Sequence, residues 1–308
     1  MDQDSKDFEV FRIRSVGASI RDGYRLYLDC FRRIFRATWL MALLYALVTG
    51  IASTLLVKEI PEFLFTNTET LQDMHIRHAF IIAGICTIVM FSEFLLYAVG
   101  FSLLNSHQRT GTMPTVTSWL GYFDGRIIVR TVISFFVLLL LVVAYFPAFA
   151  TLTEFLNKHL STIALGAATL LVLIATALFI PPVLMYLLKY ILSTSKPGKP
   201  NMPLRYWGSS IMIVIVVLIV TLLLSLVTDL PTNILTMANI QSQTGALKGD
   251  SVGMPEYMQW MNIIAFSLAG FIKAYVSLSA LFPFYYLYGS IEAQEKERVE
   301  LTQKFNNI

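Results

Sequence analysis

Residues 208–228 read GSSIMIVIVVLIVTLLLSLVT, a run of apolar and small residues without a single charged side chain. An α-helix rises about 1.5 Å per residue, so about 20 such residues cross the roughly 30 Å of hydrocarbon in a bilayer. A helix on the surface of a soluble domain keeps one polar face. This stretch has no such face and therefore predicts a transmembrane helix.

Five other stretches have the same character, and together they predict six membrane-spanning helices. The six stretches cover residues 37–57, 79–104, 127–152, 161–188, 208–228 and 260–290. The composition agrees, because 56% of the 308 residues are hydrophobic and only 14% are charged, whereas soluble domains carry about 25% charged residues. The strands of a membrane β-barrel alternate apolar and polar residues, and these stretches do not. The predicted fold class is all-α, a polytopic membrane protein.

The distribution of basic residues predicts the orientation in the membrane. The segments on the side of the N-terminus hold 18 Lys and Arg residues, and the loops on the opposite side hold 4. Cytoplasmic loops carry the excess of basic residues, so both termini are expected in the cytoplasm. A cleavable signal peptide would place its apolar run earlier than residue 37. We therefore expect a multi-pass inner-membrane protein with a cytoplasmic segment 1–36, a membrane domain 37–290 and a charged cytoplasmic tail 291–308.

The segment before the first span predicts an amphipathic helix. Ile20, Tyr24, Tyr27, Phe31 and Ile34 recur at helical spacing. Five arginines form the neighbouring basic face: Arg21, Arg25, Arg32, Arg33 and Arg36. Such a helix either lies in the cytoplasmic headgroup layer with its arginines near anionic lipid, or packs on the inner face of the protein itself. The sequence leaves both possibilities open.

Two charged residues lie deep inside predicted spans, Glu93 in the second and Lys273 in the sixth. They follow the outer ends of their spans by 14 and 13 residues, which places them at similar depth. A charge at that depth costs about 2.5–3.5 kcal/mol on insertion scales and therefore faces protein or water. We expect a Glu93–Lys273 pair that joins spans two and six, with Asn262 on the same face as Lys273. The pair is either a structural contact between helices or a site that couples protons or substrate.

The connecting segments contribute two further expectations. Residues 114–123 have helical spacing and are expected to form a short interfacial helix before the third span. The predicted outer loop 229–259 contains an apolar-spaced piece, Leu230 to Ile240, for which a short helix on the outer surface is expected.

Motifs of known catalytic or metal chemistry are absent from the sequence. It contains no phosphate-binding loop of the Walker type, no His-Glu-x-x-His, no Gly-x-Ser-x-Gly and no Cys-x-x-Cys, so an enzyme is disfavoured and no cofactor is expected. His75 and His78 are three residues apart and could bind a metal from one helix face, but no Cys or further His is near them in the sequence, so an exposed interfacial pair is expected instead. The basic residues flank the spans, where orientation accounts for them, so nucleic-acid binding is not expected.

Two segments resemble a known group of membrane proteins. They read SIRDGYRLYLDCFRRIFRATWLMALLYAL at residues 19–47 and TGTMPTVTSWLGYFDGRIIVRTVISFF at residues 110–136. The chain resembles six-span bacterial inner-membrane proteins, a group that includes the membrane domain of some glycerophosphodiester phosphodiesterases. The resemblance implies a bundle of six helices in the inner membrane and transfers no catalytic residue to this chain.

Two functions follow as alternatives. The first is a non-enzymatic membrane protein that organises or assists partners or lipids, with anionic headgroups at its cytoplasmic face and a membrane-protein partner or a second copy of itself. The second is a small transporter in which Glu93, Lys273 and Asn262 line a path. A water-filled cavity that reaches Glu93 would favour transport, whereas a dry bundle with a closed ion pair would favour the first alternative.

Overall fold

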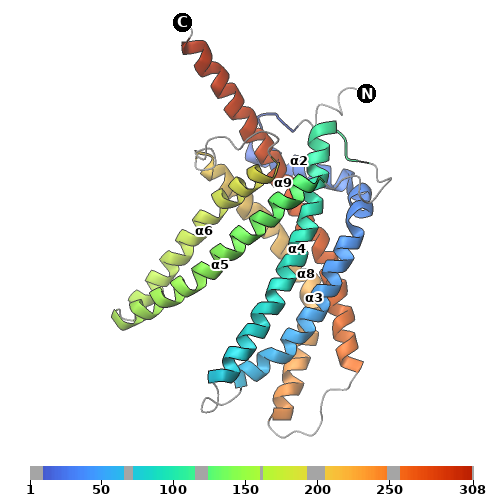
Figure 1. The fold of residues 1–308 in the computed structure, drawn as a ribbon, viewed down its shortest axis with the longest axis vertical. Helices are drawn as coiled ribbons and strands as arrows, with labels where there is room; N and C mark the ends of the chain where they lie inside the picture. Colours follow the sequence, from blue (N-terminus) through green and yellow to red (C-terminus); the bar gives the residue numbers. More distant parts are fainter. Residues whose placement is uncertain are drawn as a thin grey trace. The chain divides into compact units, whose positions relative to one another are not determined.

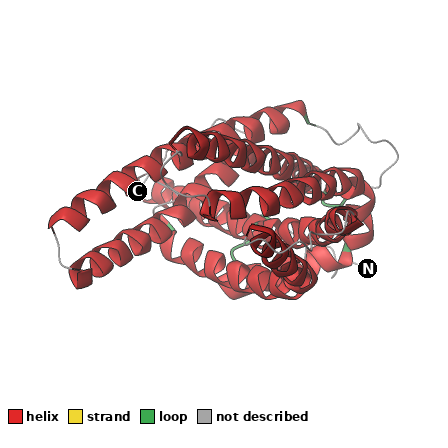
Figure 2. Ribbon diagram, turned by 90° about the horizontal axis from the view of Figure 1, so that it is seen from below, coloured by secondary structure: helices red, strands yellow, loops and turns green. Residues whose placement is uncertain are grey.

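The computed structural model describes residues 10–65, 72–114, 124–159, 162–192, 205–247 and 257–306. Within these ranges every regular element is a helix (Figure 2). In chain order the helices are α2 (Val16–Asp29), α3 (Phe31–Phe65), α4 (Gln72–Thr110), α5 (Gly125–His159), α6 (Thr162–Leu192), α8 (Trp207–Leu247) and α9 (Tyr257–Asn306) (Figure 1).

Five of these helices contain a stretch that is long and apolar enough to cross a membrane. The stretches are Phe31–Val57, Phe80–Thr110, Gly125–Tyr145, Trp207–Ser242 and Tyr257–Phe305. In α6 the apolar stretch that the structure describes, Leu178–Leu192, is shorter. Large apolar side chains on the long helices, among them Leu223 and Ile264, are exposed, as they are on helices that face lipid. The chain is therefore an all-helical, multi-pass membrane protein, which confirms the predicted fold class at this level.

The chain divides into two compact units. Unit 1 comprises Met1–Arg33, Phe101–Leu218 and Leu281–Ile308, and unit 2 comprises Ile34–Gly100 and Ile219–Ala280. Four helices, α3, α4, α8 and α9, contribute residues to both units. The candidate site around Lys273 lies in unit 2, and the basic surface of the N-terminal segment lies in unit 1.

In unit 1 the N-terminal segment docks on the second half of α9. The backbone N–H of Arg14 donates a hydrogen bond to Ser290 Oγ at 2.9 Å, and that hydroxyl donates to the Arg14 carbonyl at 3.1 Å. Gly23 of α2 lies so close to α9 that a Cβ at this position would be 2.5 Å from the Pro283 nitrogen. Tyr27 packs edge-on against Phe282 with ring centroids 5.1 Å apart. The buried face of α2 therefore contacts protein, as one of the two alternatives for this helix proposed.

The ends of α2 follow from local hydrogen bonding. The Ser15 hydroxyl caps the N-terminus by accepting a hydrogen bond from the Ala18 N–H at 3.3 Å. At Cys30 the backbone leaves the helical range, with φ −100° and ψ 4°, and α3 begins at Phe31. The amphipathic stripe predicted to run unbroken to Ile34 is therefore divided between two helices. The prediction missed this break because the spacing of apolar residues continues across it.

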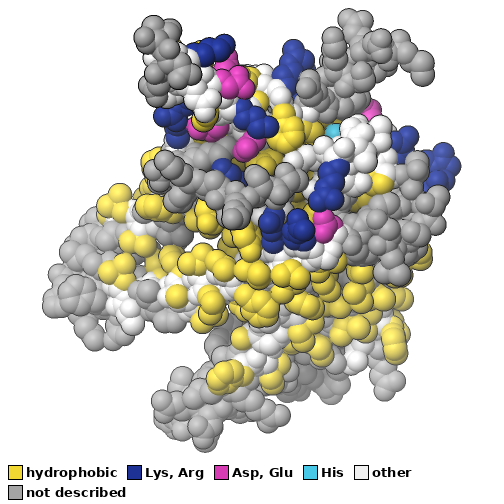
Figure 3. All heavy atoms as spheres, turned by 45° about the horizontal axis from the view of Figure 1, so that its top comes forward, with side chains coloured by type: hydrophobic (Ala, Val, Ile, Leu, Met, Phe, Trp, Pro, Cys, Tyr) yellow, Lys and Arg dark blue, Asp and Glu magenta, His cyan; other side chains and the backbone are white. Residues whose placement is uncertain are grey.

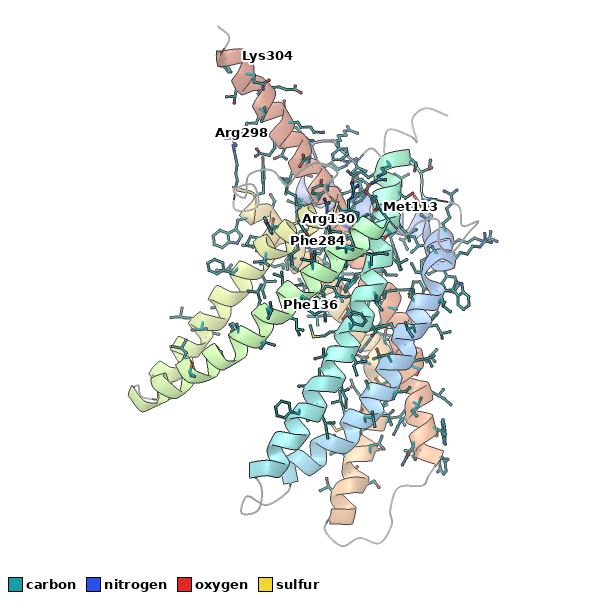
Figure 4. The ribbon with its side chains drawn as sticks, viewed as in Figure 1. Met113, Arg130, Phe136, Phe284, Arg298 and Lys304 are labelled. Carbon is teal, nitrogen blue, oxygen red and sulfur yellow. The ribbon has the colours of Figure 1, made fainter. Side chains whose placement is uncertain are left out.

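The helices α5 and α6 lie side by side in unit 1 as an antiparallel hairpin (Figure 1). Arg130 of α5, labelled in Figure 4, donates a hydrogen bond to the carbonyl of Tyr190 at 3.1 Å and lies over the ring of the same residue, 5.5 Å from its centroid. A guanidinium near the edge of a span is satisfied in this way by a backbone carbonyl and an aromatic face. This contact fixes Arg130 to the end of α6.

All six long helices are longer than the predicted spans, and in three of them the difference changes the interpretation of the sequence. The helix α8 continues through Pro231 to Leu247, so the piece expected as a separate surface helix, Leu230 to Ile240, is the continuation of span five. The helix α9 runs on to Asn306, which makes most of the charged tail a helix that carries Arg298 and Lys304 (Figure 4). The first apolar stretch begins at Phe31 rather than residue 37. The expected interfacial helix at 114–123 falls almost entirely outside the described residues.

Candidate functional site

The membrane interior of unit 2 contains an ion pair between α8 and α9. Lys273 Nζ lies 2.6 Å from Asp229 Oδ1, and both residues belong to stretches apolar enough to cross a membrane. The side chain of Lys273 is 34% exposed and that of Asp229 is 25% exposed, so the pair is only partly enclosed. Charged groups within a membrane-spanning segment are expensive unless they are paired or hydrated, and this pair meets the first condition directly.

The structure thus corrects the expected partner of Lys273. The sequence reasoning paired Lys273 with Glu93 because it ended span five at Thr228 and assigned Asp229 to an outer loop. Since α8 continues to Leu247, Asp229 is a helical residue and contacts α9. The helical spacing of Leu230 to Ile240 continues span five without a break, and this pattern could have indicated that Asp229 belongs to the same helix.

Glu93 has a local partner instead. The Tyr97 hydroxyl, one turn further along α4, donates a hydrogen bond to Glu93 Oε1 at 2.8 Å. Among the described residues the ion pairs do not include one between Glu93 and Lys273. The i, i+4 spacing of Glu93 and Tyr97 brings two side chains onto one helix face, and this contact supplies the polar partner that a carboxyl group needs in a span.

A pocket of about 170 Å³ opens beside the ion pair. Its polar lining comes from three helices: Thr49 and Ser53 from α3, Asp229, Thr232 and Asn233 from α8, and Lys273 from α9. Three residues of α9 complete it with an apolar wall, namely Phe266, Ala269 and Gly270. The pocket thus combines one cation, one anion, hydroxyl groups and an amide within the membrane-spanning part of the chain.

Small residues bring α3 and α9 together next to this pocket. A Cβ on Gly270 would lie 3.3 Å from the Ala46 Cα, and a Cβ on Gly50 would collide with the hydroxyl of Ser267. Glycine allows helix backbones to approach closely in membranes. Gly270 of α9 is therefore packed on α3.

Asn262 lies in α9 eleven residues before Lys273, a spacing that places both residues on the same face of an α-helix. Its side chain is 3% exposed, and its carbonyl oxygen has no hydrogen-bond partner among the residues that the structure describes. A buried amide oxygen without a partner costs about 1–3 kcal/mol. Asn262 is not part of the lining of the pocket, which begins one turn later at Phe266.

The basic surface of unit 1 is the second candidate site. All five predicted arginines are exposed: Arg21, Arg25, Arg32, Arg33 and Arg36. On the face shown in Figure 3, Lys and Arg side chains gather in several groups. In α2, Leu28 keeps 69% of its exposure, so the outer face of α2 combines basic and apolar side chains.

A hollow of about 260 Å³ adjoins this face at the start of α2. Four arginines and a single carboxylate line it together with small or apolar residues: Arg12, Ile13, Arg14, Ser15, Ala18, Arg21, Asp22 and Arg25. Arg14 is almost fully buried, pairs with Asp22 at 3.1 Å and lies 4.8 Å from the ring centroid of Tyr286. The basic groups outnumber the acidic one, so the hollow is electrostatically suited to an anion.

Cys30 lies at the junction of α2 and α3 and is half-buried. Burial raises the pKa of its thiol, a change that the positive charge of Arg33 opposes and the negative charge of Asp29 reinforces. The thiol is therefore less nucleophilic than a free cysteine at neutral pH.

The expected histidine pair, His75 and His78, falls within α4, but the two side chains lie outside the described ones. Where side chains are described, the structure contains no group of three His, Cys, Asp or Glu residues that could hold a metal ion.

The chain matches no protein-family model, no curated protein and no solved structure. The resemblance to the membrane domain of glycerophosphodiester phosphodiesterases therefore stays a prediction from the two segments that carry it.

Proposed function

We propose that this chain is a non-enzymatic, six-span protein of the bacterial inner membrane that binds anionic lipid headgroups at its cytoplasmic face and so organises lipids or membrane partners. The observation that carries the proposal is the hollow at the start of α2, in which Arg12, Arg14, Arg21 and Arg25 face a single aspartate. A guanidinium forms strong, geometrically specific hydrogen bonds with phosphate oxygens.

The docking of α2 supports this function because it fixes the orientation of the basic face. Gly23 and Tyr27 hold one side of the helix against α9. The opposite side presents Arg21, Arg25 and the apolar Leu28. A helix with basic and apolar groups on its free face lies at the headgroup level of a membrane. We therefore propose both roles for α2, a protein contact on one side and a lipid contact on the other.

Six spans and cytoplasmic termini are part of the same proposal. Five stretches meet the length and hydropathy of a span, and α6 is a helix of 31 residues paired with α5. The excess of basic residues in the segments 1–36, 105–130, 189–207 and 291–308 supports placing those segments inside.

Lipid retention tests the proposal. The purified protein is reconstituted in vesicles of phosphatidylcholine with or without phosphatidylglycerol, and the lipid that remains bound after detergent extraction is measured by mass spectrometry. The variant Arg21→Gln/Arg25→Gln removes two positive charges from the hollow. Each basic group near an anionic surface contributes about 1 kcal/mol, so retention of phosphatidylglycerol should fall about 30-fold.

The matched control is Arg298→Gln/Lys304→Gln, which removes the same charge from the exposed end of α9. It should retain phosphatidylglycerol as the unchanged protein does, because we expect lipid binding to depend on the arginines of the hollow and not on the overall charge of the protein. Equal retention in both variants, or no preference for phosphatidylglycerol in the unchanged protein, contradicts the proposal.

A further inference from the structure

The pocket beside the Asp229–Lys273 pair has features that a purely structural ion pair does not need. Its lining adds Thr49, Ser53 and Asn233 to the two charges, although all five residues belong to stretches that cross the membrane. Two charges that only join helices are best served by full enclosure, because exposure to lipid is costly. Here both side chains keep part of their exposure and border a polar hollow.

The size of the pocket restricts what can enter it. Its volume of about 170 Å³ leaves room for several water molecules. Ligand sites for drug-sized molecules are larger, about 300–1,000 Å³. The pocket therefore suits water or a very small polar solute.

The charge balance of the pocket restricts the chemistry of that solute. The lining holds one cation, Lys273, and one anion, Asp229, so its formal charge sums to zero. An anion that paired with Lys273 would leave the carboxylate of Asp229 without its partner. A cation that paired with Asp229 would likewise leave the ammonium group of Lys273 without its partner. A buried charge that has lost its partner is strongly unfavourable. A molecule that carries both signs replaces one ion pair by two and leaves neither charge unpaired.

We propose that this pocket binds a small zwitterion, whose anionic group pairs with Lys273 and whose cationic group pairs with Asp229. The hydroxyl group of Ser53 and the amide of Asn233 are available as further hydrogen-bonding groups. The wall formed by Phe266, Ala269 and Gly270 limits the ligand to a short, unbranched apolar part. The site is separate from the lipid surface of unit 1, so each proposal stands or fails without the other.

Equilibrium binding to the full-length protein in detergent tests the site. The probes are glycine, acetate, methylammonium and glycerol, which present both charges, the anion alone, the cation alone and no charge. Glycine should bind at least about tenfold more tightly than each of the other three, because only it compensates both protein charges. Equal binding of acetate, methylammonium or glycerol overturns the proposal, as does the absence of glycine binding up to millimolar concentrations.

Two variants locate the binding. The double substitution Asp229→Asn/Lys273→Met removes both charges together and should abolish glycine binding, whereas Glu93→Gln, which alters a carboxyl group of α4 outside the pocket lining, should bind glycine as before. If the double variant does not fold, Ser53→Leu fills the pocket and keeps the ion pair. It should weaken glycine binding at least about tenfold while the protein elutes as the unchanged protein does. Undiminished glycine binding in a folded variant of either kind contradicts the proposed site.

Discussion

The ammonium group of Lys273 lies 2.6 Å from the carboxylate of Asp229, and this contact joins α9 to α8 inside the membrane-spanning part of unit 2. This contact determines which charged residues of the spans pair with each other. Glu93 accepts a hydrogen bond from its own helix, which leaves Asp229 and Lys273 to compensate each other across two helices. The stability of unit 2 should therefore depend on residues 229 and 273 as a pair.

The first prediction is an energetic coupling between these two positions. Asp229→Asn or Lys273→Met alone leaves one charge without its partner and should lower the free energy of unfolding by about 1–3 kcal/mol. The double variant should recover most of this loss, because no unpaired charge remains. Unfolding in mixed micelles with increasing denaturing detergent measures all four proteins of the cycle.

The control for this coupling is the pairing that the sequence alone favoured. Glu93→Gln combined with Lys273→Met should give additive losses, since the two residues have different partners. Coupling between residues 93 and 273 together with additivity between 229 and 273 would show that the pairing described here is not the one that stabilises the protein.

The second prediction concerns the close contact between α2 and α9. A Cβ added at Gly23 meets the backbone of Pro283 and Phe282, so Gly23→Ala should push α2 away and cost about 1–3 kcal/mol. The expected readout is faster tryptic cleavage after Arg21 and Arg25, together with a lower melting temperature.

Gly17→Ala is the matched control on the same helix. A Cβ at Gly17 meets nothing within 4 Å, and alanine is the better helix former by about 1 kcal/mol. Gly17→Ala should therefore match or exceed the stability of the unchanged protein. If both glycine variants are cleaved at the same rate as the unchanged protein, the docking of α2 on α9 is refuted.

The third prediction is a pH dependence of Cys30 alkylation. Because burial raises the pKa of the Cys30 thiol, the reactive thiolate is scarcer than usual at neutral pH and becomes abundant only at more alkaline pH. In a Cys86→Ala background, the midpoint of the alkylation rate against pH should lie above that of an ordinary thiol.

A cysteine introduced at the exposed Gly17 of the same helix provides the reference. In a protein without Cys30 and Cys86, the variant Gly17→Cys should alkylate with a midpoint at or below that of a free thiol, since its position is exposed and lies in the first turn of α2. A Cys30 midpoint at or below that of the residue 17 cysteine contradicts the burial described for the junction of α2 and α3.

The fourth prediction tests the number of spans through the α5–α6 hairpin. If the hairpin crosses the membrane, a cysteine in place of Lys158, near the end of α5, should react with a membrane-impermeant maleimide added to intact cells. A cysteine in place of Arg205, before α8, should react only after permeabilisation. Both substitutions are made in the cysteine-free protein, and labelling of residue 158 only after permeabilisation would reduce the number of spans to four.

The basic face of α2 shows which structural features a sequence pattern can predict. Helical spacing correctly indicated a helix before the first span and the exposure of Arg21 and Arg25. It did not indicate the break at Cys30 or the docking through Gly23. Periodicity reports which side of a helix is apolar, but a close contact depends on the shape of the helix it meets, and α9 comes from the opposite end of the chain.

The ion pair shows the same limit for charged residues. That Lys273 needs a partner follows from the cost of a charge in a membrane, and the sequence therefore identified it as a residue of interest. The identity of the partner depends on where α8 ends. Helix ends are the least certain feature of a sequence-based prediction, and placing this end at Thr228 instead of Leu247 removed Asp229 from the helix.

By itself, the sequence determined that this protein is helical and crosses a membrane several times, because the length and apolarity of a segment alone decide its transfer into lipid. The tertiary structure decided which groups meet: Lys273 with Asp229, Gly23 with Pro283, and the polar side chains of three helices around one pocket. Those contacts depend on the end, rotation and spacing of each helix relative to its neighbours. Such quantities arise only when segments far apart in the chain are packed together.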